Sequence, residues 1–328
     1  MSPMQYVKLG ASGAAVSALG LGCLSFGDPD RGSHSWTLRE DAASAVIRAA
    51  LEAGINFFDT ANVYSAGDSE RILGTVLNRH ARREEVVVAT KVHGQMAPGP
   101  NGWGLSRKHI RWQVEQSLKR LGTDYIDLYQ VHRWDDTTPL EETLEALDSL
   151  VRDGLVLYLG ASSMHAWQFG KALCLQRQYG WAPFVTMQDH YNLIYREEER
   201  EMFPLLADAG VGALPYCTLA CGRLARDPDA ETPRRRRDER AEMLYRQAGA
   251  ADRRICAAVA EVAAELGASR AQVALAWVLA NPLVTAPLIG VTSVAQLTED
   301  LGALDLVLDD DQLRRLGEGY VPHAVVGL

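Results

Sequence analysis

Short apolar runs alternate with amphipathic stretches along most of the chain. The apolar runs carry many β-branched residues, which is typical of strands buried on both faces. We expect strands at residues 16–22, 57–58, 86–90, 126–131, 155–160, 184–188, 211–216 and 284–289. Between them, apolar positions recur at helical spacing, which predicts helices at 39–53, 69–77, 106–121, 140–152, 166–179 and 196–209.

This alternation favours an α/β fold with eight strand–helix units and short connections, a closed (β/α)8 TIM barrel formed by residues 1–328 as one domain. A doubly wound sheet would open with a glycine-rich turn that leads straight into a helix. The pair Gly20 and Gly22 is instead followed by Cys-Leu-Ser-Phe-Gly-Asp-Pro, which cannot begin a helix directly. Residues 5–9 and 16–19 predict an N-terminal β-hairpin that closes the bottom of the barrel.

Two stretches interrupt the pattern, and both fall on the C-terminal face of the predicted barrel. Residues 93–104 form a loop rich in glycine and proline, and residues 222–249 form a long polar insertion that contains Arg234–Arg237. Loops of this length in a compact domain are usually functional or disordered. A solvated loop is an equal alternative for the arginine run.

The net charge of −9 argues against nucleic acid or an anionic membrane as the main partner, because both need a basic surface. No apolar run approaches the length of a membrane span, and the first residues lack the features of a signal peptide. The five cysteines have irregular spacing and no histidine at zinc-ligand distance. We therefore expect reduced thiols and a cytoplasmic protein.

Four polar residues carry the candidate chemistry. Asp59, Lys91 and His132 each follow an apolar run, and Tyr64 lies in the loop after Asp59. In a parallel sheet these groups meet at the C-terminal edge. Each residue alone has an ordinary explanation, such as a helix cap or a charge at a strand end, but the four together form the proton-donor site of a reductase.

A carbonyl accepts a hydride only if its oxygen gains a proton. Tyrosine can supply that proton, but its usual pKa near 10 makes phenolate scarce at neutral pH. A neighbouring ammonium favours the phenolate, and a carboxylate keeps that ammonium charged and in position. A histidine can hold the carbonyl oxygen. Tyr64, Lys91, Asp59 and His132 are suited to these roles.

The chain resembles the aldo-keto reductase superfamily almost from end to end. The matching segments are LGLGCLSFG, DTANVYSAGDSERILG, ATKV, SLKRLGTDYIDLYQVHRWD, GASSM, MQDHYNLIYREEER and IGVTSVAQLTEDLGAL. Some of them are closest to a bacterial branch related to shaker channel β-subunits. The resemblance implies a barrel that binds NADP(H) and reduces a small aldehyde or ketone. It implies Tyr64 as the proton donor, Lys91 and Asp59 as its tuning pair, and His132 as the group that orients the carbonyl.

The same resemblance implies a cofactor site spread over several strand ends. Its residues would be Gly22, Cys23, Leu24, Asp59, Ser162, Ser163, Gln188, Tyr216, Cys217, Thr218, Leu219, Gly222, Arg234, Gly290, Thr292, Gln296, Glu299 and Asp300. Ser163 and Asp300 replace the asparagines that are usual in the family. Cys217 and Thr218 replace a Ser-Pro pair, which puts the pyrophosphate contacts of this loop in doubt. Arg234 falls where relatives bind the 2′-phosphate, and this favours NADP over NAD.

The substrate pocket is less clear from the sequence. We expect Phe26, Trp36, Trp103 and Trp134 to form an aromatic rim beside Tyr64 and His132, although these rings could equally pack the lid loops. A regulatory NADPH-binding subunit with little turnover is an alternative function, since the Ala-Cys-Gly sequence at 220–222 also occurs in channel β-subunits. A metal hydrolase lacks the paired histidines it would need. The natural carbonyl, the direction of reaction and the oligomeric state stay open.

Overall fold

A computed structural model describes residues 3–32, 34–227, 230, 237–245 and 249–327. In this part of the chain, eight parallel strands form one sheet in the order β10-β3-β4-β5-β6-β7-β8-β9. They are β3 (Gly20–Gly22), β4 (Phe57–Asp59), β5 (Val87–Val92), β6 (Ile126–Val131), β7 (Val156–Ser162), β8 (Phe184–Gln188), β9 (Gly212–Ala213) and β10 (Leu288–Ile289). A bridge between Ala213 and Val284 joins the two ends of this order. The predicted (β/α)8 barrel is confirmed.

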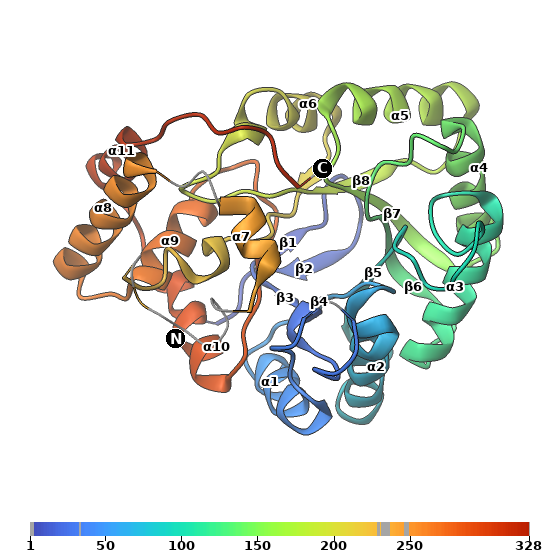
Figure 1. Ribbon diagram of the computed structural model, residues 1–328, viewed down its shortest axis with the longest axis horizontal. Helices are drawn as coiled ribbons and strands as arrows, with labels where there is room; N and C mark the ends of the chain where they lie inside the picture. Colours follow the sequence, from blue (N-terminus) through green and yellow to red (C-terminus); the bar gives the residue numbers. More distant parts are fainter. Residues whose placement is uncertain (1–2, 33, 228–229, 231–236, 246–248, 328) are drawn as a thin grey trace.

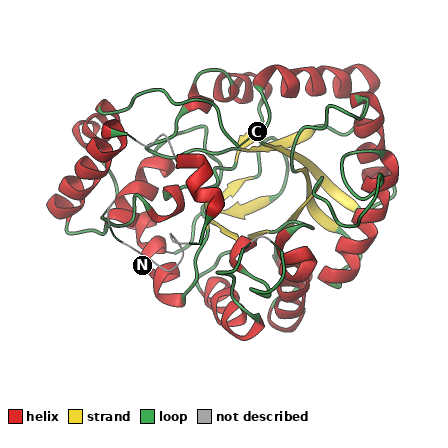
Figure 2. Cartoon of the chain, viewed as in Figure 1, coloured by secondary structure: helices red, strands yellow, loops and turns green. Residues whose placement is uncertain are grey.

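Helices surround the strands (Figure 1), and the sheet lies enclosed at the centre (Figure 2). They are α1 (Glu40–Glu52), α2 (Asp68–His80), α3 (Arg107–Leu121), α4 (Leu140–Arg152), α5 (Ala166–Tyr179), α6 (Met202–Ala209), α7 (Glu239–Tyr245), α8 (Ala250–Leu266), α9 (Arg270–Leu279), α10 (Val294–Leu301) and α11 (Asp310–Glu318). The predicted ends of α3 hold: the Ser106 side chain accepts from the His109 N–H, and Gly122 closes the helix with φ 65°. No helix in the described residues is long and apolar enough to cross a bilayer.

The N-terminal hairpin closes the bottom of the barrel, as the sequence predicts. β1 (Tyr6–Lys8) pairs antiparallel with β2 (Ala15–Ser17). Val16 of the hairpin and Leu9 of its turn pack with Phe57 and Leu128 in an apolar cluster separate from the main core. The turn approaches the barrel closely, because a Cβ at Gly10 would lie 2.0 Å from the carbonyl oxygen of Val185. Only glycine fits there without a shift of the backbone.

Several elements differ from the sequence prediction: the run at 16–22 is divided between β2 and β3, the run at 284–289 forms only β10, and α8, α9 and α11 were not expected. The run expected at 211–216 forms only the two-residue strand β9, although Leu214 and Tyr216 still donate to the carbonyls of Met187 and Asp189. The helix expected at 196–209 begins instead as the 3₁₀ turn η4 (Glu197–Glu199) and becomes α-helical only at Met202. Pro204 therefore lies in the first turn of α6, where its missing N–H costs nothing. The polar insertion at 222–249 is also not a simple loop, because it contains α7.

Candidate active site

The alternation of side chains along the barrel strands places polar groups inside the barrel near its C-terminal end. On β5, Val87, Ala89 and Lys91 share one face. Val87 and Ala89 belong to the apolar cluster inside the barrel. Lys91 pairs in register with Gln130 of β6, and both side chains are fully buried. The bottom of the barrel is thus apolar and closed. Near the C-terminal end of the strands, charged and amide side chains around Lys91 form the floor of the site.

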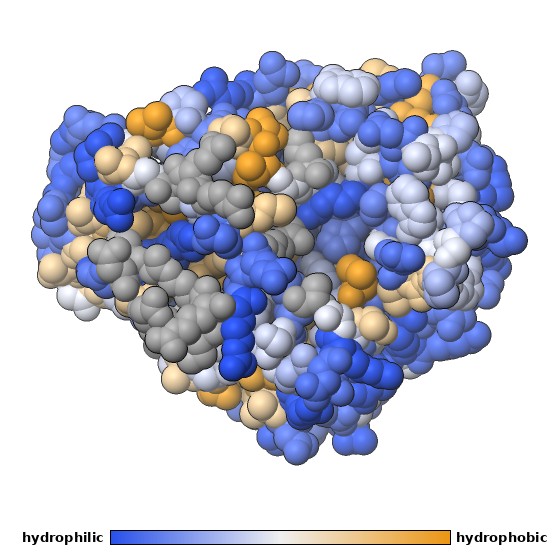
Figure 3. All heavy atoms as spheres, in the orientation of Figure 1, coloured by the Kyte–Doolittle hydropathy of each residue, from blue (hydrophilic) through white to orange (hydrophobic). Residues whose placement is uncertain are grey.

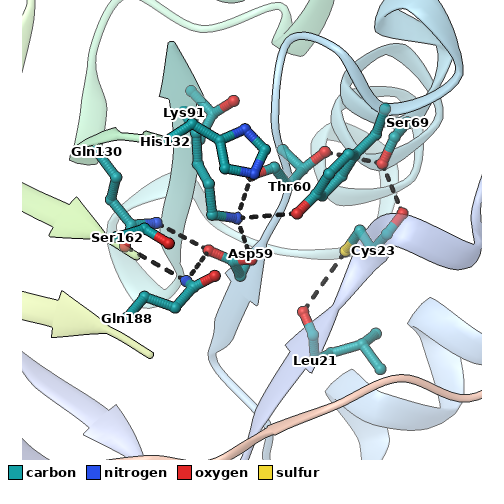
Figure 4. A network of polar contacts seen from close by, with 12 residues as sticks. Leu21, Cys23, Asp59, Thr60, Ser69, Lys91, Gln130, His132, Ser162 and Gln188 are labelled. Carbon is teal, nitrogen blue, oxygen red and sulfur yellow. Dashed lines mark hydrogen bonds and ion pairs between the residues drawn. The ribbon is translucent and has the colours of Figure 1, made fainter. Parts of the chain in front are cut away.

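Lys91 is the centre of this floor (Figure 4). Its Nζ donates to Oδ2 of Asp59 at 2.5 Å and to the backbone carbonyl of Thr60 at 2.9 Å. The third partner is the Tyr64 hydroxyl, 3.4 Å away. An ammonium has three protons to donate, so these partners satisfy all of them. Asp59, Tyr64 and Lys91, which the sequence analysis selected, therefore lie in one hydrogen-bonded group.

Two glutamines hold the other oxygen of Asp59. Oδ1 accepts from Gln130 Nε2 at 2.8 Å and from Gln188 Nε2 at 2.9 Å, and the two amides also contact each other at 3.3 Å (Figure 4). Gln130 is not among the residues that the sequence predicts for the site. The signal was present, because Gln130 is an uncharged polar residue in the apolar run 126–131, at the interior register of Lys91.

The electrostatics of the group favour a charged lysine. Burial by itself would lower the pKa of Lys91, but the charges of Asp59 and Tyr64 and their hydrogen bonds raise the pKa above its usual value. The ammonium is therefore kept next to the phenol oxygen throughout the neutral pH range. A cation in that position stabilises the phenolate relative to the phenol, which makes a tyrosine a better proton donor.

Tyr64 and His132 face each other at the edge of the floor. Their ring centroids are 5.7 Å apart in an edge-to-face arrangement. Tyr64 opens the 3₁₀ turn η2 (Tyr64–Gly67), in which Ser65 and Ala66 have φ of 46° and 54°. His132 directly follows β6, and its N–H donates to the carbonyl of Val92 at 3.0 Å. The left-handed turn and the strand end together fix the direction of the two rings.

The floor opens into a groove of about 660 Å³, and the face shown in Figure 3 is hollowed near the centre of the view. Its walls include most of the residues that the resemblance assigns to a cofactor: Gly22, Leu24, Asp59, Ser162, Gln188, Tyr216, Cys217, Thr218, Leu219, Gly222, Gly290, Thr292, Gln296, Glu299 and Asp300. Tyr64, His132 and Trp36 line the same groove. One continuous space therefore connects the Tyr64 hydroxyl to the helix α10.

Two of the predicted cofactor residues do not line the groove. Cys23 is fully buried in the apolar core, and its thiol points to the carbonyl of Leu21 at 3.6 Å, away from Lys91 (Figure 4). Burial raises the pKa of the Cys23 thiol well above its usual value. Ser163 lies behind the wall, where its hydroxyl contacts Ser162 and the Tyr216 hydroxyl, each at 3.2 Å. Arg234 lies outside the described residues.

Three of the predicted rim aromatics also lie away from the groove. Phe26 is fully buried in the core. Trp134 is half-buried against the core, donates to Asp136 at 2.6 Å and contacts Trp167 edge to face. Trp103 is exposed and packs on His93. Trp36 is the one of the four predicted rim aromatics that lines the groove.

Among the described residues, four arginines line the groove: Arg237 belongs to the run noted in the sequence, whereas Arg133, Arg223 and Arg226 were not expected there. Arg223, Arg226 and Arg237 come from the insertion after β9. The guanidinium of Arg223 lies over the ring of Tyr245 at 4.9 Å. The same insertion also contributes Asp227, Asp238 and Glu242 to the groove, so arginines that suit phosphate groups lie among carboxylates on this wall.

The far end of the groove is formed by α10. Gln296 Oε1 accepts from the backbone N–H of Thr292 at 2.8 Å and from its hydroxyl at 3.0 Å, and this fixes the loop that enters the helix. Asp300 is buried one turn further on. Burial, together with the charge of Glu299, raises the pKa of Asp300 to about 7. Within the described residues, no group of three or more His, Cys, Asp or Glu side chains is arranged to hold a metal.

The model of the aldo/keto reductase family matches residues 18–320. The chain belongs to this family. It is 40% identical to an aldo-keto reductase of Fusarium vanettenii, with 99% of this chain and 93% of that protein covered. It is 42% identical to an aldo-keto reductase of Metarhizium robertsii, with the same shares covered, and 38% identical to versiconal hemiacetal acetate reductase of Aspergillus parasiticus, with 98% of each covered. This member of the family is therefore an oxidoreductase.

Proposed function

We propose that this protein is an NADP-dependent carbonyl reductase in which Tyr64 donates the proton. The observation that carries the proposal is the position of Lys91, whose buried ammonium contacts both the Asp59 carboxylate and the Tyr64 hydroxyl at the inner end of the groove. Burying two charges is costly, and here the pair lies directly beside the Tyr64 hydroxyl, which lines the groove.

Each residue of the site has a defined task in this proposal. Tyr64 donates its phenolic proton to the oxygen of the substrate carbonyl, and Lys91 stabilises the phenolate that remains. Asp59 keeps Lys91 charged, while Gln130 and Gln188 keep Asp59 in place. His132 orients the carbonyl oxygen toward Tyr64. When bound, NADPH supplies the hydride for the carbonyl carbon. The same groups serve the reverse reaction, oxidation of an alcohol.

The walls of the groove fit an extended dinucleotide. Tyr216 offers an aromatic face near Ser162 and Gln188, which suits a nicotinamide ring and its carboxamide. A Cβ at Gly222 or Gly290 would meet open space, so the chain leaves room there. The arginines that the insertion after β9 contributes to the groove are available to phosphates, and an arginine at the 2′-phosphate would favour NADP over NAD. Asp300 would lie at the adenine end.

The part of the groove nearest Tyr64 favours a carbonyl with an apolar body. Trp36, Leu24 and Leu38 line the groove together with His34 and Arg133, and a cleft with apolar walls and a few polar groups is typical of small-molecule sites. The substrate is therefore proposed as a small aldehyde or ketone.

Titration of the pure protein with NADPH and with NADH, followed by fluorescence, tests the cofactor assignment. We expect NADPH to bind at least about tenfold more tightly, because an arginine at a 2′-phosphate adds a charge-assisted contact. Arg226→Gln should reduce this preference, and Arg177→Gln on α5 is the matched control outside the groove. Equal weak binding of both nucleotides would contradict the assignment. Tight NADPH binding without turnover on a broad carbonyl panel would instead support the regulatory alternative.

A further inference from the structure

Two cysteines lie side by side in the wall of the groove. The sulfur atoms of Cys217 and Cys221 are 3.7 Å apart, and both side chains are half-buried and line the groove. The other thiols have different surroundings. Cys23 and Cys256 are buried with pKa values raised by burial, and Cys174 is exposed on α5. Cys217 and Cys221 therefore combine mutual contact with access to the space that a ligand or oxidant enters.

The backbone holds this pair together. The Ala220 N–H donates to the Cys217 carbonyl at 2.7 Å, and the Gly222 N–H donates to the Leu219 carbonyl at 2.8 Å. Cys217, Ala220 and Cys221 all have positive φ, between 50° and 54°. This conformation costs a non-glycine residue about 1 kcal/mol or more, and such residues gather at functional sites. The segment is thus a tight, strained turn whose ends carry the two thiols.

We propose that Cys217 and Cys221 form a dithiol modification site that a peroxide-type oxidant converts to a disulfide. One thiolate attacks a peroxide oxygen, which gives a sulfenic acid and one water. The second thiolate then attacks that sulfenic sulfur and displaces a second water, so that two thiols and one hydrogen peroxide give one disulfide and two waters. The two sulfurs together lose two electrons, and a dithiol reductant reverses the reaction.

Closure of this disulfide changes the groove. A disulfide has an S–S bond of about 2.05 Å, so the sulfurs must approach each other from 3.7 Å. Thr218 and Leu219 lie between them and line the groove, so this wall has to shift. The change also reaches α7, because the amide of Asn192 donates both to the Cys217 carbonyl and to the Tyr245 hydroxyl, each at 2.9 Å. We therefore expect weaker cofactor binding, a consequence that rests on the proposed function.

The test uses the full chain treated with hydrogen peroxide and then digested without reductant. Mass spectrometry should find a peptide with an internal Cys217–Cys221 disulfide, and this readout does not depend on any cofactor. In parallel, NADPH affinity should fall about tenfold, the loss expected from one charge-assisted contact, and should return with dithiothreitol. Cys174→Ser should respond like the unmodified sequence, since this exposed thiol lies on α5.

The single variants decide the assignment. Cys217→Ser and Cys221→Ser should each bind NADPH equally well before and after peroxide treatment, because neither variant can form the disulfide. Absence of the disulfide peptide, or an unchanged peroxide response in either variant, would overturn the modification site. A disulfide that leaves NADPH affinity unchanged would overturn its link to the groove. A disulfide in a protein that never binds NADPH would support the site and contradict the proposed function instead.

Discussion

Asp59 and Lys91 form an ion pair at 2.5 Å whose side chains are 4% and 0% exposed. Neither charge could be buried at this place alone, since an isolated ion in the interior loses several kcal/mol of hydration. The amides of Gln130 and Gln188 and the Thr60 carbonyl complete the hydrogen bonds of the pair. The strands β4, β5, β6 and β8 thus each supply one side chain to the hydrogen-bonded group around this ion pair. The ammonium of the pair also contacts the Tyr64 hydroxyl.

Lys91→Met should stop proton transfer and weaken the fold. We expect the rate of carbonyl reduction to fall by about 10²-fold or more, because Tyr64 loses the cation that stabilises its phenolate. Unfolding in urea should become easier by about 3–5 kcal/mol, because Asp59 remains buried without its partner.

The double variant Asp59→Asn, Lys91→Met is the control for this result. It removes both charges, so part of the lost stability should return while the activity stays low. Additive losses of stability in the double variant would show that the two residues do not interact as described.

Gln130→Met and Gln188→Met should have different effects, although both amides bind the same oxygen of Asp59. Gln188 lines the groove, whereas Gln130 is fully buried beneath it. We expect both variants to lower kcat, but only Gln188→Met to weaken NADPH binding. Loss of one hydrogen bond to a charged group should cost each variant about 1.5–3 kcal/mol of stability. Fluorescence titration and steady-state rates separate the two effects, and identical Kd values would argue against Gln188 as a cofactor contact.

Asp300 predicts a pH dependence of stability. Its pKa is raised to about 7 by burial and by Glu299, whereas the unfolded chain has the ordinary value near 3.9. The folded state therefore binds the extra proton, so the stability contributed by neutral Asp300 is present below about pH 4 and is lost as pH rises through 7.

Asp300→Asn should remove this dependence. Relative to the unmodified chain, we expect the variant to gain stability from pH 5 to pH 8, with a difference on the order of 3 kcal/mol at the upper end. Urea unfolding at a series of pH values measures it. The exposed Asp310→Asn on α11 is the matched control and should show no such trend. A constant difference between the Asp300 variant and the unmodified chain would contradict the shifted pKa.

The sequence predicts the elements whose pattern is local. β6 and α5 have their observed ends because an apolar strand run and a helical repeat, each closed by turn residues, specify them directly. The positions of Asp59, Lys91 and His132 at strand ends also follow from the alternation. Side chains in loops are harder to predict, since their direction depends on distant contacts.

Cys23 and Trp134 show this limit. Cys23 lies in the segment that the resemblance assigns to the cofactor, but the turn after β3 directs its thiol into the core. Trp134 follows His132 by two residues, yet its ring packs on the core and Trp167. Gln130 could not be assigned to the site for another reason. An amide in an apolar strand can be placed beside Lys91 only when the register of β5 and β6 is known.

Arg83 should affect stability without affecting chemistry. Its guanidinium donates to Asp127 at 2.6 Å and to the carbonyl of Tyr125 at 2.9 Å, at the start of β6 and far along the strand from His132. Arg83→Met should cost about 2 kcal/mol, the usual loss for hydrogen bonds to a charged group. The kcat at saturating substrate and the NADPH Kd should stay unchanged. A lowered kcat would mean that this end of the barrel is coupled to the site.

The most direct test of the central claim is the rate of hydride transfer in Tyr64→Phe, measured in a single turnover with saturating NADPH and para-nitrobenzaldehyde as the probe carbonyl. The substitution removes the phenolic oxygen that contacts Lys91 Nζ and keeps the ring beside His132. We predict an NADPH Kd within about twofold of the unmodified protein and a transfer rate lower by about 10²–10⁴-fold, the usual contribution of a positioned acid. Transfer at the unmodified rate would contradict Tyr64 as the proton donor.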